Sequence, residues 1–215
     1  MPKCMPKLNA LAIVLSALFI LTACKTTGMS SILGGGETAT LPTFQVGDQF
    51  EYINDRKEKV IRTVTAVQGE TVAWDTETSY HYVGYRNFIL PRIQWEGVHS
   101  RGRAISGLPA DLLWPLVPGT EKTFTVEFER YDKVKKQSRQ YEQKWTCKVY
   151  KPREVKVPAG TFDANKITCK EKSKKGRAMR TRQWFYAPSI GNFVKRVKRY
   201  KDGATLNMDL VAVNK

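Results

Sequence analysis

Two cysteine thiols in the second half of the chain, Cys147 and Cys169, are placed to oxidise to a disulfide. The midpoint of the two positions is Pro158, inside the turn-forming run Val157-Pro-Ala-Gly-Thr, so a regular hairpin would set them opposite each other. Period-two alternation puts both on the apolar face of their strands. Closing a loop of about twenty residues contributes about 3 kcal/mol of stability. The alternatives are two reduced core thiols, or a redox or metal pair, which the absence of a Cys-x-x-Cys spacing disfavours.

The amino terminus combines a basic start, an apolar run and a cysteine. Lys3 and Lys7 are followed by the almost wholly apolar run 8–21, and the small residue Ala23 stands just before Cys24. This order is typical of a secretory signal. A plain transmembrane anchor is the alternative, but the run has only about fourteen residues where a spanning helix needs about 20. Such an anchor would also give no reason for the cysteine.

The sequence Leu21-Thr-Ala-Cys resembles the lipobox of bacterial lipoprotein precursors. In that family a signal peptidase cuts before the cysteine, which carries diacylglycerol on its sulfur and a fatty acid such as palmitate on its amino group. The resemblance implies a signal peptide at residues 1–23 and lipidation of Cys24. It also implies a location in the cell envelope, an oxidising setting that favours the disulfide. Because Lys25 is not the Asp that retains many such proteins on the inner membrane, the outer membrane, facing the periplasm, is favoured for a Gram-negative host.

Two further segments follow from composition and periodicity. In residues 24–41 small, polar and glycine residues dominate, which predicts a flexible tether after the lipidated cysteine. Residues 42–215 have the length of one domain with its own core. Their dominant period is two, so we predict an all-β domain, an antiparallel meander that forms a curled sheet, half-barrel or sandwich. The predicted strands are 50–53, 59–67, 71–76, 87–94, 122–130, 140–150, 161–171, 180–186, 192–200 and 205–213.

The chain is strongly basic, with 36 Lys and Arg against 20 Asp and Glu and a formal charge of +16. The excess is concentrated in residues 130–201, where cations alternate with apolar residues, so we expect one cationic sheet face. We predict that this face binds lipopolysaccharide, peptidoglycan or another envelope protein. The candidate anion-binding residues are Lys166, Lys170, Lys172, Lys174, Lys175, Arg177, Lys195, Arg196, Lys198 and Arg199.

Other interpretations of the charge and of the aromatic residues stay open. A basic surface that is merely solvated would have the same composition. Nucleic acid would favour the same electrostatics, but the export signal argues against it as a partner. The second function class is a carrier that holds an apolar or lipid ligand inside the curled sheet. The Tyr-rich run 80–86 would then line the mouth of the ligand site, or it is an ordinary connection.

Catalytic patterns do not stand out. The sequence has no Gly-x-Ser-x-Gly elbow, no phosphate-binding Gly-x-x-x-x-Gly-Lys and no His-Glu-x-x-His. The two histidines, His81 and His99, have no neighbour in sequence that defines a metal ligand or a general base. We therefore expect a protein that is not an enzyme and that has no resident cofactor or metal.

The carboxyl-terminal half contains two turn motifs, Pro158-Ala-Gly-Thr-Phe and Tyr186-Ala-Pro-Ser-Ile-Gly. Together they resemble a pattern of uncharacterised bacterial envelope proteins with a curled β-sheet. The resemblance covers about the last hundred residues and implies an architecture but no activity. Physically, Gly160 and Gly191 suit turns that need a positive φ.

Overall fold

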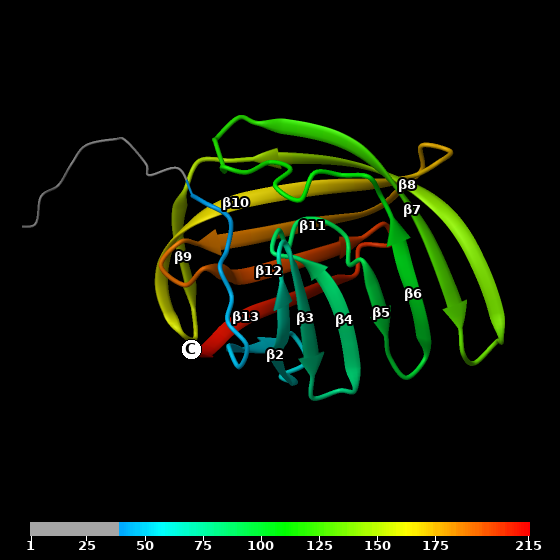
Figure 1. The fold of residues 1–215 in the computed structure, drawn as a ribbon. Helices are drawn as coiled ribbons and strands as arrows, with labels where there is room; N and C mark the ends of the chain where they lie inside the picture. Colours follow the sequence, from blue (N-terminus) through cyan, green and yellow to red (C-terminus); the bar gives the residue numbers. More distant parts are fainter. Residues whose placement is uncertain (1–38) are drawn as a thin grey trace, which may run out of the picture. The chain divides into compact units, whose positions relative to one another are not determined.

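The structure, a computed structural model, describes residues 39–215. The predicted signal peptide, Cys24 and most of the predicted tether lie outside the described residues. Residues 39–215 contain strands and turns but no α-helix, which confirms the all-β prediction (Figure 1). In this part of the chain no helix is long and apolar enough to cross a membrane. The strands are β1 (Gln49–Asn54), β2 (Lys59–Gln68), β3 (Thr71–Thr76), β4 (Tyr80–Tyr85), β5 (Gln94–Glu96), β6 (Ser100–Ile105), β7 (Glu121–Asp132), β8 (Gln137–Val149), β9 (Arg153–Val157), β10 (Gly160–Ser173), β11 (Ala178–Ala187), β12 (Asn192–Tyr200) and β13 (Thr205–Asn214).

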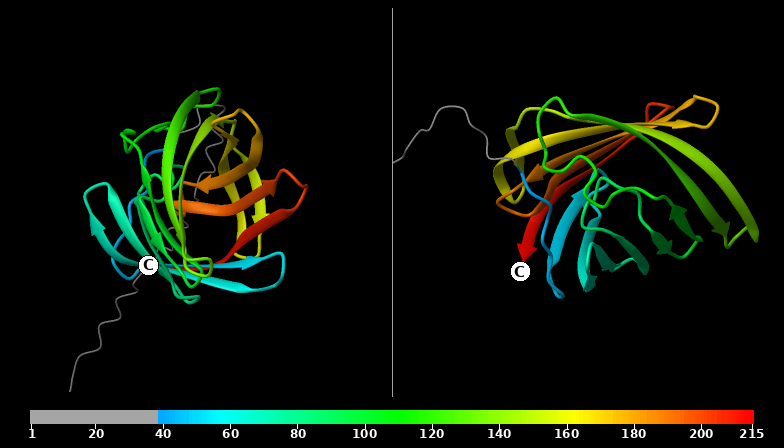
Figure 2. Two further views of the ribbon diagram at one scale, coloured as in Figure 1. Left: turned by 90° about the vertical axis from the view of Figure 1, so that its right-hand side faces the viewer. Right: turned by 45° about the horizontal axis from the view of Figure 1, so that its top comes forward.

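The strands form one antiparallel sheet of 13 strands that closes on itself. Its order is β11-β12-β13-β1-β2-β3-β4-β5-β6-β7-β8-β10-β9, and β11 also pairs with β10. All strands except β9 therefore belong to a closed ring, while β9 pairs with β10 alone. Figures 1 and 2 show that β10 to β13 run across the direction of β2 to β6, so the sheet wraps around an interior. Most connections join neighbouring strands, as the predicted meander requires.

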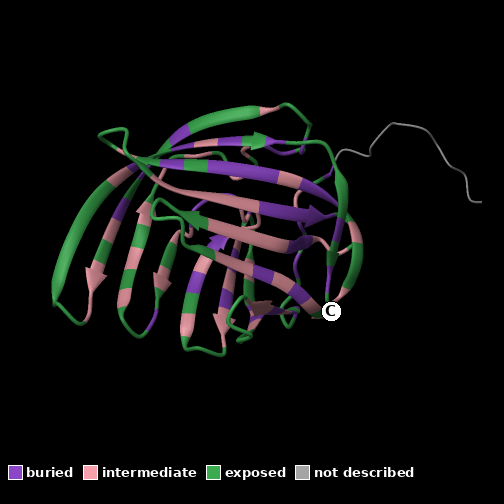
Figure 3. Cartoon of the chain, turned by 180° about the vertical axis from the view of Figure 1, so that it is seen from behind, coloured by how far each residue is buried: buried purple, intermediate pink, exposed green. Residues whose placement is uncertain are grey.

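Buried side chains fill only part of this interior. Trp145, Tyr52, Phe50 and Phe193 are among the largest fully buried side chains. Along β8, residues 137–141 are exposed, and burial alternates only from Gln143 onward. Figure 3 shows the same contrast, with exposed residues toward the tips of β7 and β8. The core therefore packs one part of the closed sheet and leaves the interior accessible from another.

The disulfide prediction is confirmed, since Cys147 on β8 bonds to Cys169 on β10. The two residues face each other in the strand register, and both are fully buried. The expected hairpin is interrupted, however, because β8 and β9 pair in succession with the single long strand β10. The turns behave as expected, with φ of +133° at Gly160 and +69° at Gly191.

Several strand predictions differ from the structure. Residues 87–93 form turns instead of the predicted strand, because the Asn87 side chain accepts a hydrogen bond from the Ile89 amide and donates one to the Leu112 carbonyl. Pro91 also lacks an amide hydrogen for a sheet ladder. Conversely, β5, β6 and β9 were not predicted. The Tyr-rich run 80–86 proves to be mainly strand β4.

Candidate anion-binding cleft

The predicted cationic residues divide between two surfaces of the sheet. On β10, Lys170 and Lys172 are exposed on the face opposite Cys169 and Glu171, and Lys166 is half-buried on that same outer face. The turn between β10 and β11 exposes Lys174, Lys175 and Arg177, and Arg199 on β12 is exposed as well. We call these seven residues the outer basic face. Lys195 is half-buried and forms an ion pair with Asp209 at 2.8 Å.

The prediction of a single face is wrong for Arg196 and Lys198, which line the interior of the sheet. The cause is a bulge in the pairing of β11 with β12, where Phe185 and Tyr186 oppose Lys195 and Phe193. The extra residue, Val194, changes which side chains of β12 face inward. The prediction also placed the adjacent residues Lys195 and Arg196 on one face, although successive side chains of a strand point to opposite faces.

The interior holds a cleft of about 340 Å³, bordered by cations and aromatic rings. We call it the arginine cleft. No Asp or Glu is among its lining residues in the described part of the chain. The cations that matter for its chemistry are Arg62, Arg92, Arg180, Arg182, Arg196 and Lys198. This arrangement resembles neither an apolar carrier pocket nor a flat basic surface.

Arg62 on β2 is the most deeply buried of these cations, with 8% of its surface exposed. Its guanidinium carbon lies 4.5 Å from the ring centre of Trp74, and the rings of Tyr82 and Phe193 lie 5.5 Å and 5.3 Å away. These rings stabilise the charge through their faces. Nη2 donates a hydrogen bond to the Tyr82 hydroxyl, but Nη1 is buried and has no hydrogen-bond partner in the described part of the chain.

The unpaired Nη1 of Arg62 indicates what kind of group the cleft could bind. Stacking on aromatic rings satisfies the face of a guanidinium, while its N–H groups still require acceptors in the plane. A buried charged donor left without an acceptor costs free energy. An anionic oxygen in the cleft would remove that cost, and guanidinium groups match carboxylate and phosphate geometry particularly well.

Arg92 and Arg182 are also held by aromatic rings. The guanidinium carbon of Arg92 lies 4.1 Å from the ring centre of Tyr82, and that of Arg182 lies 4.7 Å from the ring centre of Trp145. Glu171 on β10, fully buried, forms ion pairs with both Arg180 and Arg182. One carboxylate thus offsets part of the charge of two arginines, and the rest of the cluster is left without a carboxylate.

Burial and mutual repulsion lower the pKa values of two cations of the cluster, Arg196 and Lys198. Burial and, after it, the charges of Arg62, Arg92 and Arg182 lower the pKa of Arg196 to about 9. Burial likewise lowers the pKa of Lys198 to about 7, with the nearby Arg182 and Arg196 as the next causes. At Arg62 burial acts in the same direction, but Tyr82 and Tyr52 outweigh it and raise the pKa. Surroundings that lower the pKa of Arg196 and Lys198 in this way favour the binding of negative charge beside them.

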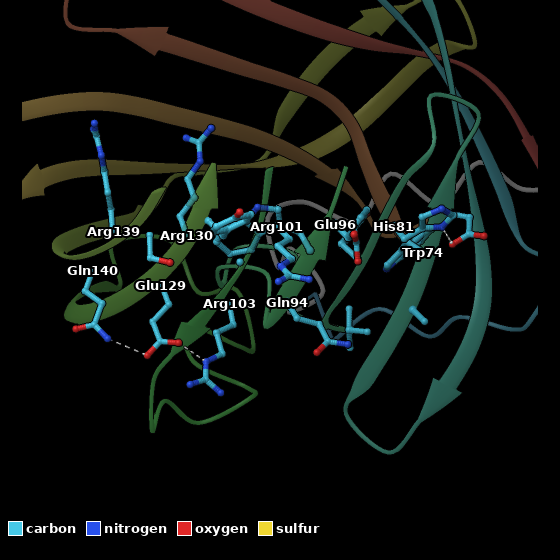
Figure 4. Close-up of a pocket in the computed structure, with 18 residues that line it drawn as sticks. Trp74, His81, Gln94, Glu96, Arg101, Arg103, Glu129, Arg130, Arg139 and Gln140 are labelled. Carbon is cyan, nitrogen blue, oxygen red and sulfur yellow. Dashed lines mark hydrogen bonds and ion pairs between the residues drawn. The ribbon is translucent and has the colours of Figure 1, made fainter. Parts of the chain in front are cut away.

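A second hollow of about 630 Å³ lies against β3 to β8 and shares Trp74, Tyr82, Trp95 and Arg130 with the first. Figure 4 shows Arg130 and Arg139 extending to one side of β7 and β8, with Glu129, Arg103 and Gln140 on the other.

Acidic side chains stand beside some of the cations that line this second hollow. Arg103 and Glu129 are 2.6 Å apart, and His81 and Asp75 are 2.7 Å apart. Arg101, Arg130 and Arg139 form no ion pair among the described residues, but Asp75, Glu96 and Glu129 line the same hollow, so it is a weaker candidate for anion recognition than the arginine cleft. Within residues 39–215 no group of His, Cys, Asp and Glu is arranged to hold a metal ion.

Two proteins of known structure have a fold similar to that of this chain. No protein-family model and no curated protein matches the chain. The chain is similar in structure to the hypothetical lipoprotein YmcC from Escherichia coli K12, with a TM-score of 0.55, 8% identity, and coverage of 78% of this chain and 85% of that one. It is also similar to a Bacteroides fragilis protein described as exported with a YmcC-like fold, with a TM-score of 0.51, 13% identity, and coverage of 82% and 100%. The chain therefore shares its fold with these two proteins.

Proposed function

We propose that this chain is a non-enzymatic lipoprotein of the cell envelope, anchored through Cys24, that binds an anionic ligand in the arginine cleft. The observation that carries the binding proposal is the buried Arg62, whose Nη1 lacks an acceptor among residues 39–215, in a cleft that no acidic side chain of those residues lines. The anchoring rests on the lipobox resemblance. The fold likeness to YmcC is compatible with it.

The proposed site combines parts of the two hypotheses drawn from the sequence, an anionic ligand and a ligand inside the sheet. The ligand is anionic, as the basic composition suggested, but it lies inside the sheet, where the carrier hypothesis placed an apolar ligand. The run 80–86 supports this location, since Tyr80, Tyr82 and Tyr85 all line the cleft. A purely apolar ligand would leave several buried cations without counter-charge.

Native mass spectrometry of the full chain, purified in a neutral detergent, tests the nature of the ligand. We expect a bound species that carries phosphate, carboxylate or sulfate groups and that dissociates at high salt. An uncharged acyl-chain species as the sole adduct would overturn the proposal in favour of the apolar carrier.

The outer basic face is a second candidate surface for an envelope polyanion. Lys172 and Lys144 stand directly opposite each other on β10 and β8, both exposed, and like charges in that arrangement are destabilising unless an anion lies over them.

Reversal of Lys174, Lys175 and Arg177 to Glu is expected to weaken retention on lipopolysaccharide or peptidoglycan, with a steep salt dependence in the wild type. Exposed charges contribute only about 0–1 kcal/mol each, so the melting temperature should hardly change. Unchanged retention at low and moderate salt would mean that this face is only solvated.

The anchor is tested at Cys24. Cys24→Ser is expected to leave an unprocessed or mislocalised precursor, because the thioether to diacylglycerol cannot form. Cells grown with an alkyne fatty acid should label the wild-type chain and not the variant on a gel. Equal labelling of the two would refute lipidation at this residue.

Binding in the cleft should depend on pH through Lys198. In the free protein its pKa is about 7, and a bound anion raises that pKa, so binding takes up a proton at neutral and basic pH. Affinity for benzene-1,3-disulfonate, whose own charge is constant, should therefore fall above pH 7 by up to about tenfold per pH unit. Lys198→Met should flatten this profile in calorimetric titrations. A wild-type profile that is flat between pH 6 and pH 9 would contradict the assignment.

A further inference from the structure

We propose that the arginine cleft takes a small organic anion carrying at least two negatively charged groups, one of them at Arg62 and another toward Lys198. This inference rests on the proposed function, and it adds the charge, the size and the orientation of the ligand. Its support is the arrangement of the cations, the volume of the cleft and the aromatic rings between them.

The cations of the cleft form a continuous series in which each charge acts on its neighbours. Arg196 is near enough to Arg62, Arg92 and Arg182 for all three charges to act on it. Lys198 in turn is near Arg180, Arg182, Arg196 and Arg92. Arg62 therefore connects to Lys198 through Arg196, two positions before Lys198 on β12.

A single negative charge cannot neutralise this series. Glu171 is the one carboxylate that forms ion pairs with cleft-lining cations in the described residues, and it is shared by Arg180 and Arg182. Arg62, Arg92, Arg196 and Lys198 form no ion pair within that part of the chain. Arg86 and Arg196, which also line the cleft, resemble Arg62 in having a buried nitrogen, Nε, without a hydrogen-bond partner among the described residues. Four cations without an ion pair, together with these unpaired donors, favour a ligand with at least two anionic groups over one with a single charge.

The size of the cleft sets an upper limit on the ligand. A volume of about 340 Å³ lies at the small end of the range for small-molecule sites, about 300–1,000 Å³. Phe88 and Trp184, whose ring centres are 6.3 Å apart, line the same space and offer apolar contact to a carbon frame. A compact ring or short chain bearing two or three phosphate, carboxylate or sulfate groups fits these constraints.

Gly84 on β4 offers a way to block the cleft without removing a charge. It lines the cleft, its φ is not positive, and a Cβ added there would meet only the Tyr82 ring, at 4.0 Å. Gly84→Leu should therefore project a side chain into the ligand space. Gly107→Leu is a matched control, because a Cβ at Gly107 meets nothing within 4 Å and Gly107 does not line the cleft.

The experiment is a calorimetric titration of the full chain in neutral detergent at constant ionic strength, with benzenesulfonate and benzene-1,3-disulfonate as probes. We expect the disulfonate to bind at least tenfold more tightly than the monosulfonate. Gly84→Leu should reduce the disulfonate affinity at least tenfold, and Gly107→Leu should leave it unchanged.

The contradicting outcomes separate the two proposals. Equal affinities of the two probes, both lost in Gly84→Leu, would overturn the multivalent ligand while leaving an anion site in the cleft. No cleft-dependent binding of either probe would overturn the proposed function itself. Dextran sulfate that binds more tightly than the disulfonate and is blocked by Gly84→Leu would show a polymer as the occupant, and would overturn the size limit.

Discussion

Replacing Arg62 with Met is expected to stabilise the free protein while it abolishes anion binding in the arginine cleft. Met keeps most of the contact with Trp74, Tyr82 and Phe193 and removes a buried charge that has no carboxylate partner. Replacing buried ionic groups with apolar residues of similar volume commonly stabilises a protein, here by about 1–3 kcal/mol. Denaturant unfolding in a buffer without multivalent anions measures the stability, and titration with benzene-1,3-disulfonate measures the binding.

A cation on the outer basic face provides the control for this prediction. Lys170→Met removes the same formal charge from an exposed position, so stability should change by at most about 1 kcal/mol, and binding in the cleft should persist. Loss of stability in Arg62→Met together with unchanged binding would mean that Arg62 is only structural. The opposite pattern, with stability gained and function lost, is typical of residues kept for binding.

Removal of the disulfide between Cys147 and Cys169 is expected to have the other large effect. The bond joins residues 22 positions apart, and losing the constraint on the unfolded chain should cost about 3 kcal/mol. Cys147→Ala with Cys169→Ala should lose somewhat more, because both side chains are fully buried and their packing is lost too. The melting temperature with and without a reductant measures the first effect, and the double variant measures the second.

The reductant itself needs a control, which the double variant supplies. It should melt at the same temperature with and without reductant, since the described residues contain no other pair of cysteines. Wild-type protein that melts identically in both conditions would contradict a stabilising disulfide. Alkylation of cells before lysis, followed by peptide mapping, would show whether the bond exists in the envelope.

The fold was predictable where a local signal sets the structure. Period-two alternation identified most of the strands because one face of each is buried, and the placement of Cys147 and Cys169 about Pro158 gave their pairing. Turns at Gly160 and Gly191 followed from glycine's access to positive φ. The closure of the ring through β10 and β11 was not predictable from composition, because pairing across the sheet leaves no mark within a single strand.

The site was harder to predict, since its cations occupy positions that the alternation assigns to the core. Arg62 takes the inward position before Val64, and Arg182 shares its face of β11 with Trp184. An arginine among inward aromatic residues was the available signal, but the number of exposed lysines nearby obscured it. Alternation along β12 separates Arg196 and Lys198 from Lys195 and Arg199, but the bulge at Val194 decides which pair faces inward, and the pattern does not show the bulge.

A crystal structure of the protein grown with selenate would show directly whether an anion binds beside Arg62. Selenate is a compact dianion whose anomalous scattering identifies it without reference to its shape. We expect an anomalous peak within hydrogen-bond distance of Nη1 of Arg62, and its loss in crystals of Arg62→Met. Peaks confined to the lysines of the outer basic face, with only water beside Arg62, would contradict anion binding in the arginine cleft.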